Sequence, residues 1–186
     1  MSWAWIRPAD ASVLDGRPLL DLGCGDGQTA RALAPEGYVL CLDRSIVNLG
    51  AARRTGCGRL VCADAGAIPA RAAFRTVLAA DLFHHLDDGP LVEVLREVRR
   101  VLVDGGRLVA WWYGRPPAPT RRTPDAPRFA RTYEEVAAYA QRAGLGPRPL
   151  DIEVGLDPAP PTAALVARPS GSPGAPGGPG SSGSTS

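Results

Sequence analysis

The stretch Leu19-Leu-Asp-Leu-Gly-Cys-Gly-Asp-Gly27 decides the fold, because an apolar strand meets a glycine-rich turn within it. The short apolar run of residues 18–22 is typical of a buried strand, and a helical segment is expected at residues 28–34. Glycines at alternate positions allow a sharp turn and a close backbone approach to a ligand at the positive end of a helix. Gln28 stands where the dinucleotide fingerprint needs a small residue, which argues against a nicotinamide enzyme. A tight turn without a ligand is the alternative.

The same alternation of strands and helices continues along the chain. Further strands are expected at residues 38–42, 59–62, 76–80 and 107–112, and helices from Ser45 to Arg54, at 88–103 and at 133–143. This order predicts an α/β fold with right-handed crossovers, a mostly parallel sheet and helices on both faces. Residues 150–154 and 163–167 should close the sheet as an antiparallel hairpin at its edge.

Composition predicts one folded domain in the 186 residues. We expect an N-terminal segment at 1–16, a domain at 17–168 and a disordered tail at 169–186, which is built almost entirely of Gly, Ser and Pro. The 21 basic residues are all arginine, so chemistry that needs a lysine amine is excluded. A net charge of +2 is too small for a general polyanion binder.

The cellular location of the protein and its metal content are predicted from sequence patterns that the chain does not contain. No apolar run approaches the roughly 18 residues of a membrane span, and the start carries no signal-peptide pattern, so a cytoplasmic protein without a membrane partner is expected. The four cysteines contain no C-x-x-C pair. Neither a metal site nor a disulfide framework is therefore expected.

Three aspartates stand at the carboxyl ends of predicted strands. These are Asp21, Asp43 and Asp64, which follow or end the first, second and third strands. Ligands of open α/β sheets bind at this edge, and an acid at the end of the second strand can accept hydrogen bonds from both hydroxyls of a ribose. For Asp43 alone, a helix-capping role on the surface is an equal alternative.

These residues, with four further motifs, resemble a known family. Leu42-Asp43-Arg44-Ser45, Ala63-Asp64-Ala65, Phe83-His84-His85-Leu86 and the segment 101–109 are similar to successive motifs of class I S-adenosylmethionine-dependent methyltransferases. The resemblance is to the small type 11 group, with its quinone-biosynthesis and tRNA carboxymethyl-uridine enzymes, and it covers about residues 17–168. It implies a Rossmann-like three-layer sandwich with a seven-stranded sheet whose last strand is antiparallel.

The resemblance also implies a binding site for S-adenosyl-L-methionine. Asp21 and the loop 23–27 would hold the methionine part, Asp43 the ribose, and Asp64 with the backbone of Ala65 the adenine. The implied cofactor-binding set is Asp21, Gly23, Cys24, Gly25, Gly27, Asp43, Arg44, Asp64, Ala65 and Ala80. The chain departs from the family pattern at Arg75, Ala80 and Asp104.

Methyl transfer needs alignment and exclusion of water, and a catalytic residue is optional. His84 is the candidate proton acceptor, although such a histidine is often structural. Trp112 or Tyr113 is expected to line a substrate pocket. The arginine-rich segment 114–131, with Arg121 and Arg122, is either a solvated loop or a site for a carboxylate or phosphate.

The leading prediction is a methyltransferase that acts on a small molecule at O, N or C, with an anionic acceptor as the option that the arginine-rich segment offers. One alternative is the esterification of tRNA wobble carboxymethyl-uridine, in which the arginines would meet phosphates. Another is a cofactor-binding protein without activity. Methylation of DNA amines is disfavoured, because no D/N-P-P-Y/F motif follows the fourth strand. The acceptor and the oligomeric state stay open.

Overall fold

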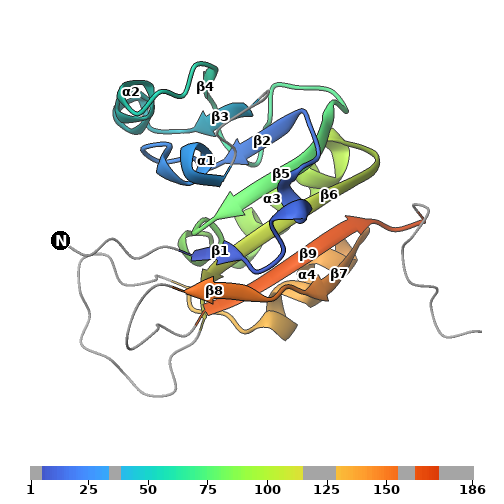
Figure 1. Ribbon diagram of the computed structural model, residues 1–186. Coiled ribbons are helices and arrows are strands. Elements are labelled where there is room, and N and C mark those ends of the chain that lie inside the picture. The colour runs from blue at the N-terminus through green and yellow to red at the C-terminus, as the bar shows by residue number, and fades with distance from the viewer. Residues whose placement is uncertain (1–5, 34–38, 115–128, 155–161, 172–186) are drawn as a thin grey trace, which may run out of the picture.

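The computed structural model describes residues 6–33, 39–114, 129–154 and 162–171, and it contains a seven-stranded sheet (Figure 1). Its strands lie in the order β4-β3-β2-β5-β6-β9-β7. β9 is antiparallel to β6 and β7, whereas the other neighbours are parallel. The predicted α/β fold and the reversed last strand are thus confirmed. The strands are β2 (Leu19–Leu22), β3 (Val39–Asp43), β4 (Leu60–Cys62), β5 (Phe74–Ala80), β6 (Leu102–Tyr113), β7 (Leu145–Pro149) and β9 (Thr162–Pro169).

Helices cover both faces of this sheet, as predicted. The α-helices are α1 (Gln28–Leu33), α2 (Ile46–Arg54), α3 (Asp88–Val101) and α4 (Tyr133–Arg142), with 3-10 turns η1 (Ala11–Leu14) and η2 (Phe83–His85). α3 and α4 pack on the face that buries Leu20, Val77 and Leu108. The other face, with Leu19 and Cys41, packs against η1, α1 and α2.

Local signals fix the starts of the helices. Ser45 caps α2 as predicted, because its side chain accepts a hydrogen bond from the Asn48 N–H at 3.3 Å. A capping box begins α4, in which Thr132 and Glu135 each bond the other's backbone N–H. Among the described residues, no helix combines the length and the apolar character that a membrane crossing needs.

The predicted closing hairpin is wrong in one of its two strands. β9 pairs with β7 (Leu145–Pro149), and β8 (Ile152–Val154) pairs instead with β1 (Ile6–Pro8) in a separate two-stranded sheet. The sequence predicts no strand at residues 145–149, which contain Pro147 and Pro149. β7 is an edge strand, however, where a residue without an N–H is tolerated.

Element boundaries differ from the sequence prediction at α3, which ends at Val101, because β6 already begins at Leu102. In the segment 1–16, Leu14 is buried against Leu19 and Leu78 of the sheet. β9 extends to Pro169. The division of the chain into an N-terminal segment, a domain and a tail stays a prediction.

Candidate functional site

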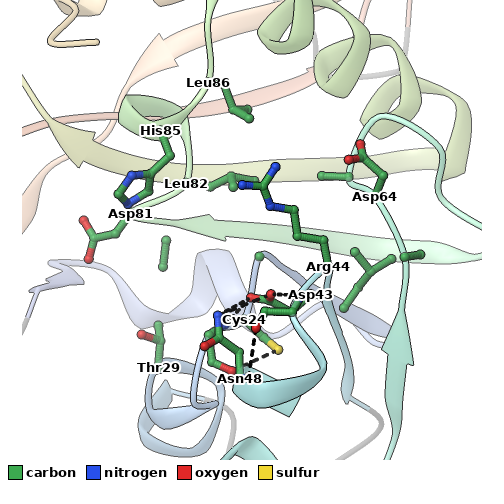
Figure 2. Close-up of a pocket in the computed structure, with 17 residues that line it drawn as sticks. Cys24, Thr29, Asp43, Arg44, Asn48, Asp64, Asp81, Leu82, His85 and Leu86 are labelled. Carbon is green, nitrogen blue, oxygen red and sulfur yellow. Dashed lines mark hydrogen bonds between the residues drawn. The ribbon is translucent and has the colours of Figure 1, made fainter. Parts of the chain in front are cut away.

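A cavity of about 520 Å³ opens at the carboxyl edge of the parallel strands (Figure 2). Twelve of its lining residues follow or end β2, β3 and β4, and we call this side the glycine-loop wall. It consists of Gly23, Cys24, Gly25, Thr29, Leu42, Asp43, Arg44, Ser45, Asn48, Ala63, Asp64 and Ala65. The opposite side follows or ends β5 and is called the η2 wall. It consists of Ala80, Asp81, Leu82, His85 and Leu86.

The glycines of the first loop have two different roles. Gly23, Gly25 and Gly27 have φ values of 73°, 55° and 77°, a region that L side chains rarely adopt. A Cβ on Gly27 would lie 2.5 Å from Cys57 Sγ, so this glycine is required by packing. A Cβ on Gly25 would meet no atom within 4 Å. Gly25 therefore presents bare backbone to the cavity, which suits the close approach of a ligand.

Asp43 holds the glycine-loop wall together. Its carboxylate accepts hydrogen bonds from the N–H of Gly25 at 2.9 Å, the N–H of Ser45 at 2.8 Å and the side-chain amide of Asn48 at 3.3 and 3.4 Å. These bonds join the loop after β2 to the start of α2. Three donor groups share the roughly four acceptor positions of the ionised carboxylate, which leaves room for about one further donor, and Asp43 lines the cavity.

Asp21 lies beneath this wall and is not among the residues that line the cavity. It is only 1% exposed, and no residue in the described part of the chain bonds its Oδ2. Burial, with a smaller effect of Asp43, raises the pKa of Asp21 to about 7. A contact between Asp21 and the methionine part of a cofactor stays a prediction.

Asp64 lies at the far end of the glycine-loop wall, beyond β3 and β4. Its Oδ1 accepts the Gly66 N–H at 2.7 Å, and its side chain is exposed. Arg44 extends from the end of β3 across the cavity toward Leu82, as Figure 2 shows. The structure therefore brings Gly23, Cys24, Gly25, Asp43, Arg44, Asp64, Ala65 and Ala80 together around one cavity. Gly27, like Asp21, lies outside its lining.

The structure places His85, and not His84, at the cavity. His84 is 2% exposed, and its Nδ1 accepts the Tyr113 N–H at 3.4 Å. Burial, helped by the neighbouring His85, lowers the pKa of His84 to about 4. A buried, neutral imidazole whose Nδ1 is already bonded is a poor proton acceptor for a ligand. The role of His84 as a base stays a prediction that its burial disfavours, whereas His85 lines the cavity.

Asp81, which sequence reasoning passed over, stands on the η2 wall. It follows the last residue of β5 and has a φ of 56°, the one positive value among the described residues other than glycine. Its Oδ1 is buried and has no hydrogen-bond partner in the described ranges. Burial raises the pKa of Asp81 to about 6. The sequence signal was its place at a strand end, the criterion that singled out Asp43 and Asp64.

The four predicted substrate residues have different outcomes. Trp112 is fully buried in the core, and its indole N–H donates to the Arg131 carbonyl at 3.1 Å, so it does not line this cavity. Tyr113 is half-buried beside His84, with ring centroids 5.2 Å apart. Arg121 and Arg122 lie outside the described residues.

Arg131 anchors the η2 wall from behind. Its guanidinium donates to the Phe83 carbonyl at 3.1 Å and to Asp88 Oδ1 at 2.8 Å, and the residue is 5% exposed. The Phe129 N–H also donates to the His84 carbonyl at 3.0 Å. Arg131 therefore ties η2 and the start of α3 to the chain that leads into α4. The arginine-rich composition of its neighbourhood concealed this role.

No group of three His, Cys, Asp or Glu side chains in the described ranges is arranged to hold a metal ion. All four cysteines are free. Contact with Cys24 and burial raise the pKa of Cys41 above the ordinary thiol value, and burial raises that of Cys57 to about 12. These groups are thus protonated thiols that pack beneath the glycine loop.

Comparison with known proteins gives one family and several relatives. Residues 19–106 match the model of a methyltransferase domain. A 27-O-demethylrifamycin SV methyltransferase of Amycolatopsis mediterranei is 32% identical over 151 residues, which cover 71% of this chain and 55% of the relative. The chain therefore spans about half the length of this curated relative.

Solved structures agree with the fold. The complex of DhpI with SAH has a TM-score of 0.65 and 21% identity, over 82% of this chain and 76% of that one. An S-adenosylmethionine-dependent methyltransferase of Mesorhizobium loti has a TM-score of 0.65 and 19% identity, over 86% and 98% of the two chains. At this identity the likeness concerns the fold alone.

Proposed function

We propose that the protein is a class I, S-adenosylmethionine-dependent methyltransferase that methylates a small molecule, on the premise that residues 19–106 match a methyltransferase domain. The observation that carries the proposal is the glycine-loop wall, where bare backbone at Gly25 meets the ordered carboxylate of Asp43. The S-adenosylmethionine that this site would hold supplies an electrophilic methyl group on a positively charged sulfur.

The residues present fit this cofactor. The space over Gly25 admits a ligand against the backbone, where an alanine methyl group would intrude. Asp43 lines the cavity and has room for about one further donor, such as a ribose hydroxyl, and Asp64 and Ala65 line the same wall, where the adenine would lie. The carboxylates around the cavity suit a ligand that carries positive charge.

The residues of the chain would contribute to methyl transfer mainly by aligning the cofactor and the acceptor. The bonds of Asp43 fix the loop and α2 before the cofactor arrives, so little ordering entropy is lost on binding. Leu82 of the η2 wall packs against Gly23 of the glycine-loop wall and so joins the two walls of the cavity. The acceptor would enter beside the η2 wall.

A small-molecule acceptor is supported by the 27-O-demethylrifamycin SV methyltransferase, whose name describes methylation of a small molecule. No observation in the described residues favours tRNA or a protein without activity. The proposal that the acceptor is anionic is supported only by the presence of Arg121 and Arg122 in the sequence. The cytoplasmic location also stays a prediction.

Calorimetry with S-adenosylmethionine and its demethylated product, S-adenosylhomocysteine, tests the proposal. The wild type should bind both, and Asp43→Asn should weaken binding at least roughly tenfold because charge-assisted hydrogen bonds are lost. Asp26→Asn is the matched control, since this loop carboxylate is exposed and bonds only the neighbouring Gln28. No binding by the wild type would contradict the function. Labelled cofactor with a metabolite extract of the host should then yield a methylated small molecule.

A further inference from the structure

Asp81 combines an uncommon backbone conformation with a buried side-chain oxygen that lacks a hydrogen-bond partner among the described residues. Its φ of 56° is uncommon for an aspartate, and the backbone N–H holds this conformation by donating to the Trp111 carbonyl at 2.9 Å. Asp81 is one of the residues that line the cavity, and its buried Oδ1 has no hydrogen-bond partner among the described residues. A strained residue that keeps a buried acceptor atom unpaired at a cavity is expected where a ligand supplies the missing partner.

The order of the strands places Asp81 at one end of the site. Asp64 follows β4, Asp43 ends β3, the glycine loop follows β2 and Asp81 follows β5. Neighbouring strands are about 4.8 Å apart, so three spacings separate the first and last of these carboxylates by roughly 14 Å. Figure 2 shows Asp64 and Asp81 at opposite ends, with Asp43 between them. With the adenosine at Asp43 and Asp64, the transferred methyl group would lie toward Asp81.

We propose that Asp81 accepts the proton that the methyl acceptor loses, and that the acceptor group is therefore a hydroxyl or an amine. This inference rests on the proposed function. A lone pair of the acceptor oxygen or nitrogen forms the new bond to the methyl carbon. The carbon–sulfur bond breaks, its electron pair stays on sulfur as a neutral thioether, and the acceptor's proton passes to the Asp81 carboxylate.

Other titratable groups surround Asp81. Tyr113 on β6 lies close enough for the charge of Asp81 to contribute to raising its pKa, after the larger effect of burial. η2 carries His84 and His85, and β2 carries Asp21, which is level with Leu78 of β5. Arg44 reaches over the cavity from the opposite wall. Of these groups, His85 is the competing proton acceptor, because it also lines the cavity.

A pair of cofactor analogues tests the position of this charge without a known acceptor. Sinefungin carries an ammonium group near the place of the transferred methyl, whereas S-adenosylhomocysteine carries none there. Calorimetry at pH 8 should show a preference of roughly tenfold for sinefungin, because an ammonium next to a carboxylate forms a charge-assisted bond. Since burial raises the pKa of Asp81 to about 6, the preference should decline as pH falls through 6.

Asp81→Asn is the decisive variant, because asparagine also tolerates the left-handed conformation. It should abolish the preference for sinefungin and leave the affinity for S-adenosylhomocysteine within about twofold, since this ligand has no cation at that place. Asp104→Asn, an exposed carboxylate on β6, should behave as the wild type. A preference that survives in Asp81→Asn, or one that His85→Gln removes while Asp81→Asn does not, would overturn the inference. Failure of both analogues to bind the wild type would instead reject the proposed function itself.

Turnover distinguishes a hydroxyl from an amine. With labelled S-adenosylmethionine and a panel of phenols, aliphatic alcohols and amines, the class that is methylated identifies the acceptor atom. Asp81→Asn should lower kcat roughly 100-fold with an unchanged KM for the cofactor, as expected for a lost general base. Equal kcat in the variant and the wild type would overturn the assignment of the proton to Asp81.

Discussion

The two walls of the cavity are built in different ways. In the glycine-loop wall, Asp43 accepts hydrogen bonds from the loop after β2 and from the start of α2, and these donors are at most 18 residues away. The η2 wall instead contains Asp81, whose Oδ1 has no hydrogen-bond partner in the part of the chain that the structure describes, and it is held in place by Arg131, 48 residues from Phe83. One wall is thus prepared before a ligand arrives, whereas the other leaves an acceptor atom for the ligand to satisfy. We infer that the glycine-loop wall binds the cofactor and that the η2 wall binds the methyl acceptor.

The largest expected effect concerns the protonation of Asp21, which lies beneath the glycine-loop wall. Its pKa is raised from 3.8 to about 7, so the folded protein holds this proton more tightly than the unfolded chain. The extra stability that this bound proton gives the folded state is fully present below about pH 4 and is lost as the pH rises through 7. The wild type should lose on the order of 4 kcal/mol of unfolding free energy over this range relative to Asp21→Asn.

Urea unfolding of both proteins between pH 4 and pH 8 measures this difference. Asp26→Asn, at an exposed carboxylate of the same loop, should follow the wild-type profile. Parallel profiles for the wild type and Asp21→Asn would show that Asp21 titrates normally in the folded state.

The next effect separates packing from ligand contact within the glycine loop. Gly25→Ala should weaken binding of S-adenosylhomocysteine about 100-fold, or 2.7 kcal/mol, because its methyl group enters the cavity rather than the protein. Gly105→Ala is matched to it, with a φ of 74°, no atom within 4 Å of the added Cβ and a place outside the cavity. Calorimetry and urea unfolding should find similar stability in both variants and a binding defect in Gly25→Ala alone. An equal affinity in the two variants would remove Gly25 from the cofactor site.

The smallest effect tests the anchor of the η2 wall. Arg131→Met should lower the unfolding free energy by about 2 kcal/mol, because the Phe83 carbonyl loses its buried donor and the ion pair with the exposed Asp88 is broken. Affinity for S-adenosylhomocysteine should change less than twofold, since that ligand would contact the other wall. Arg142→Met, on the exposed end of α4, is the control. Loss of S-adenosylhomocysteine binding in Arg131→Met would show that the two walls are not independent.

The difference between the walls also explains what the sequence could predict. Asp43, Asp64 and the glycine loop were found because strand ends and turn residues are local signals that spacing reveals. The roles of Asp81 and Arg131 depend on which strands become neighbours and on a contact across 48 residues, which spacing does not contain. For the same reason the sequence does not predict the edge strand Leu145–Pro149, because an edge strand tolerates prolines on the side where no strand pairs with it. His84 was preferred to His85 because burial is decided by tertiary packing.

A crystal structure with bound S-adenosylhomocysteine tests the central claim most directly. The account predicts the adenine beside Asp64 and Ala65, the ribose hydroxyls on the Asp43 carboxylate and the sulfur directed toward Asp81 on the η2 wall. Adenine beside Asp81, or binding outside the cavity, would contradict it.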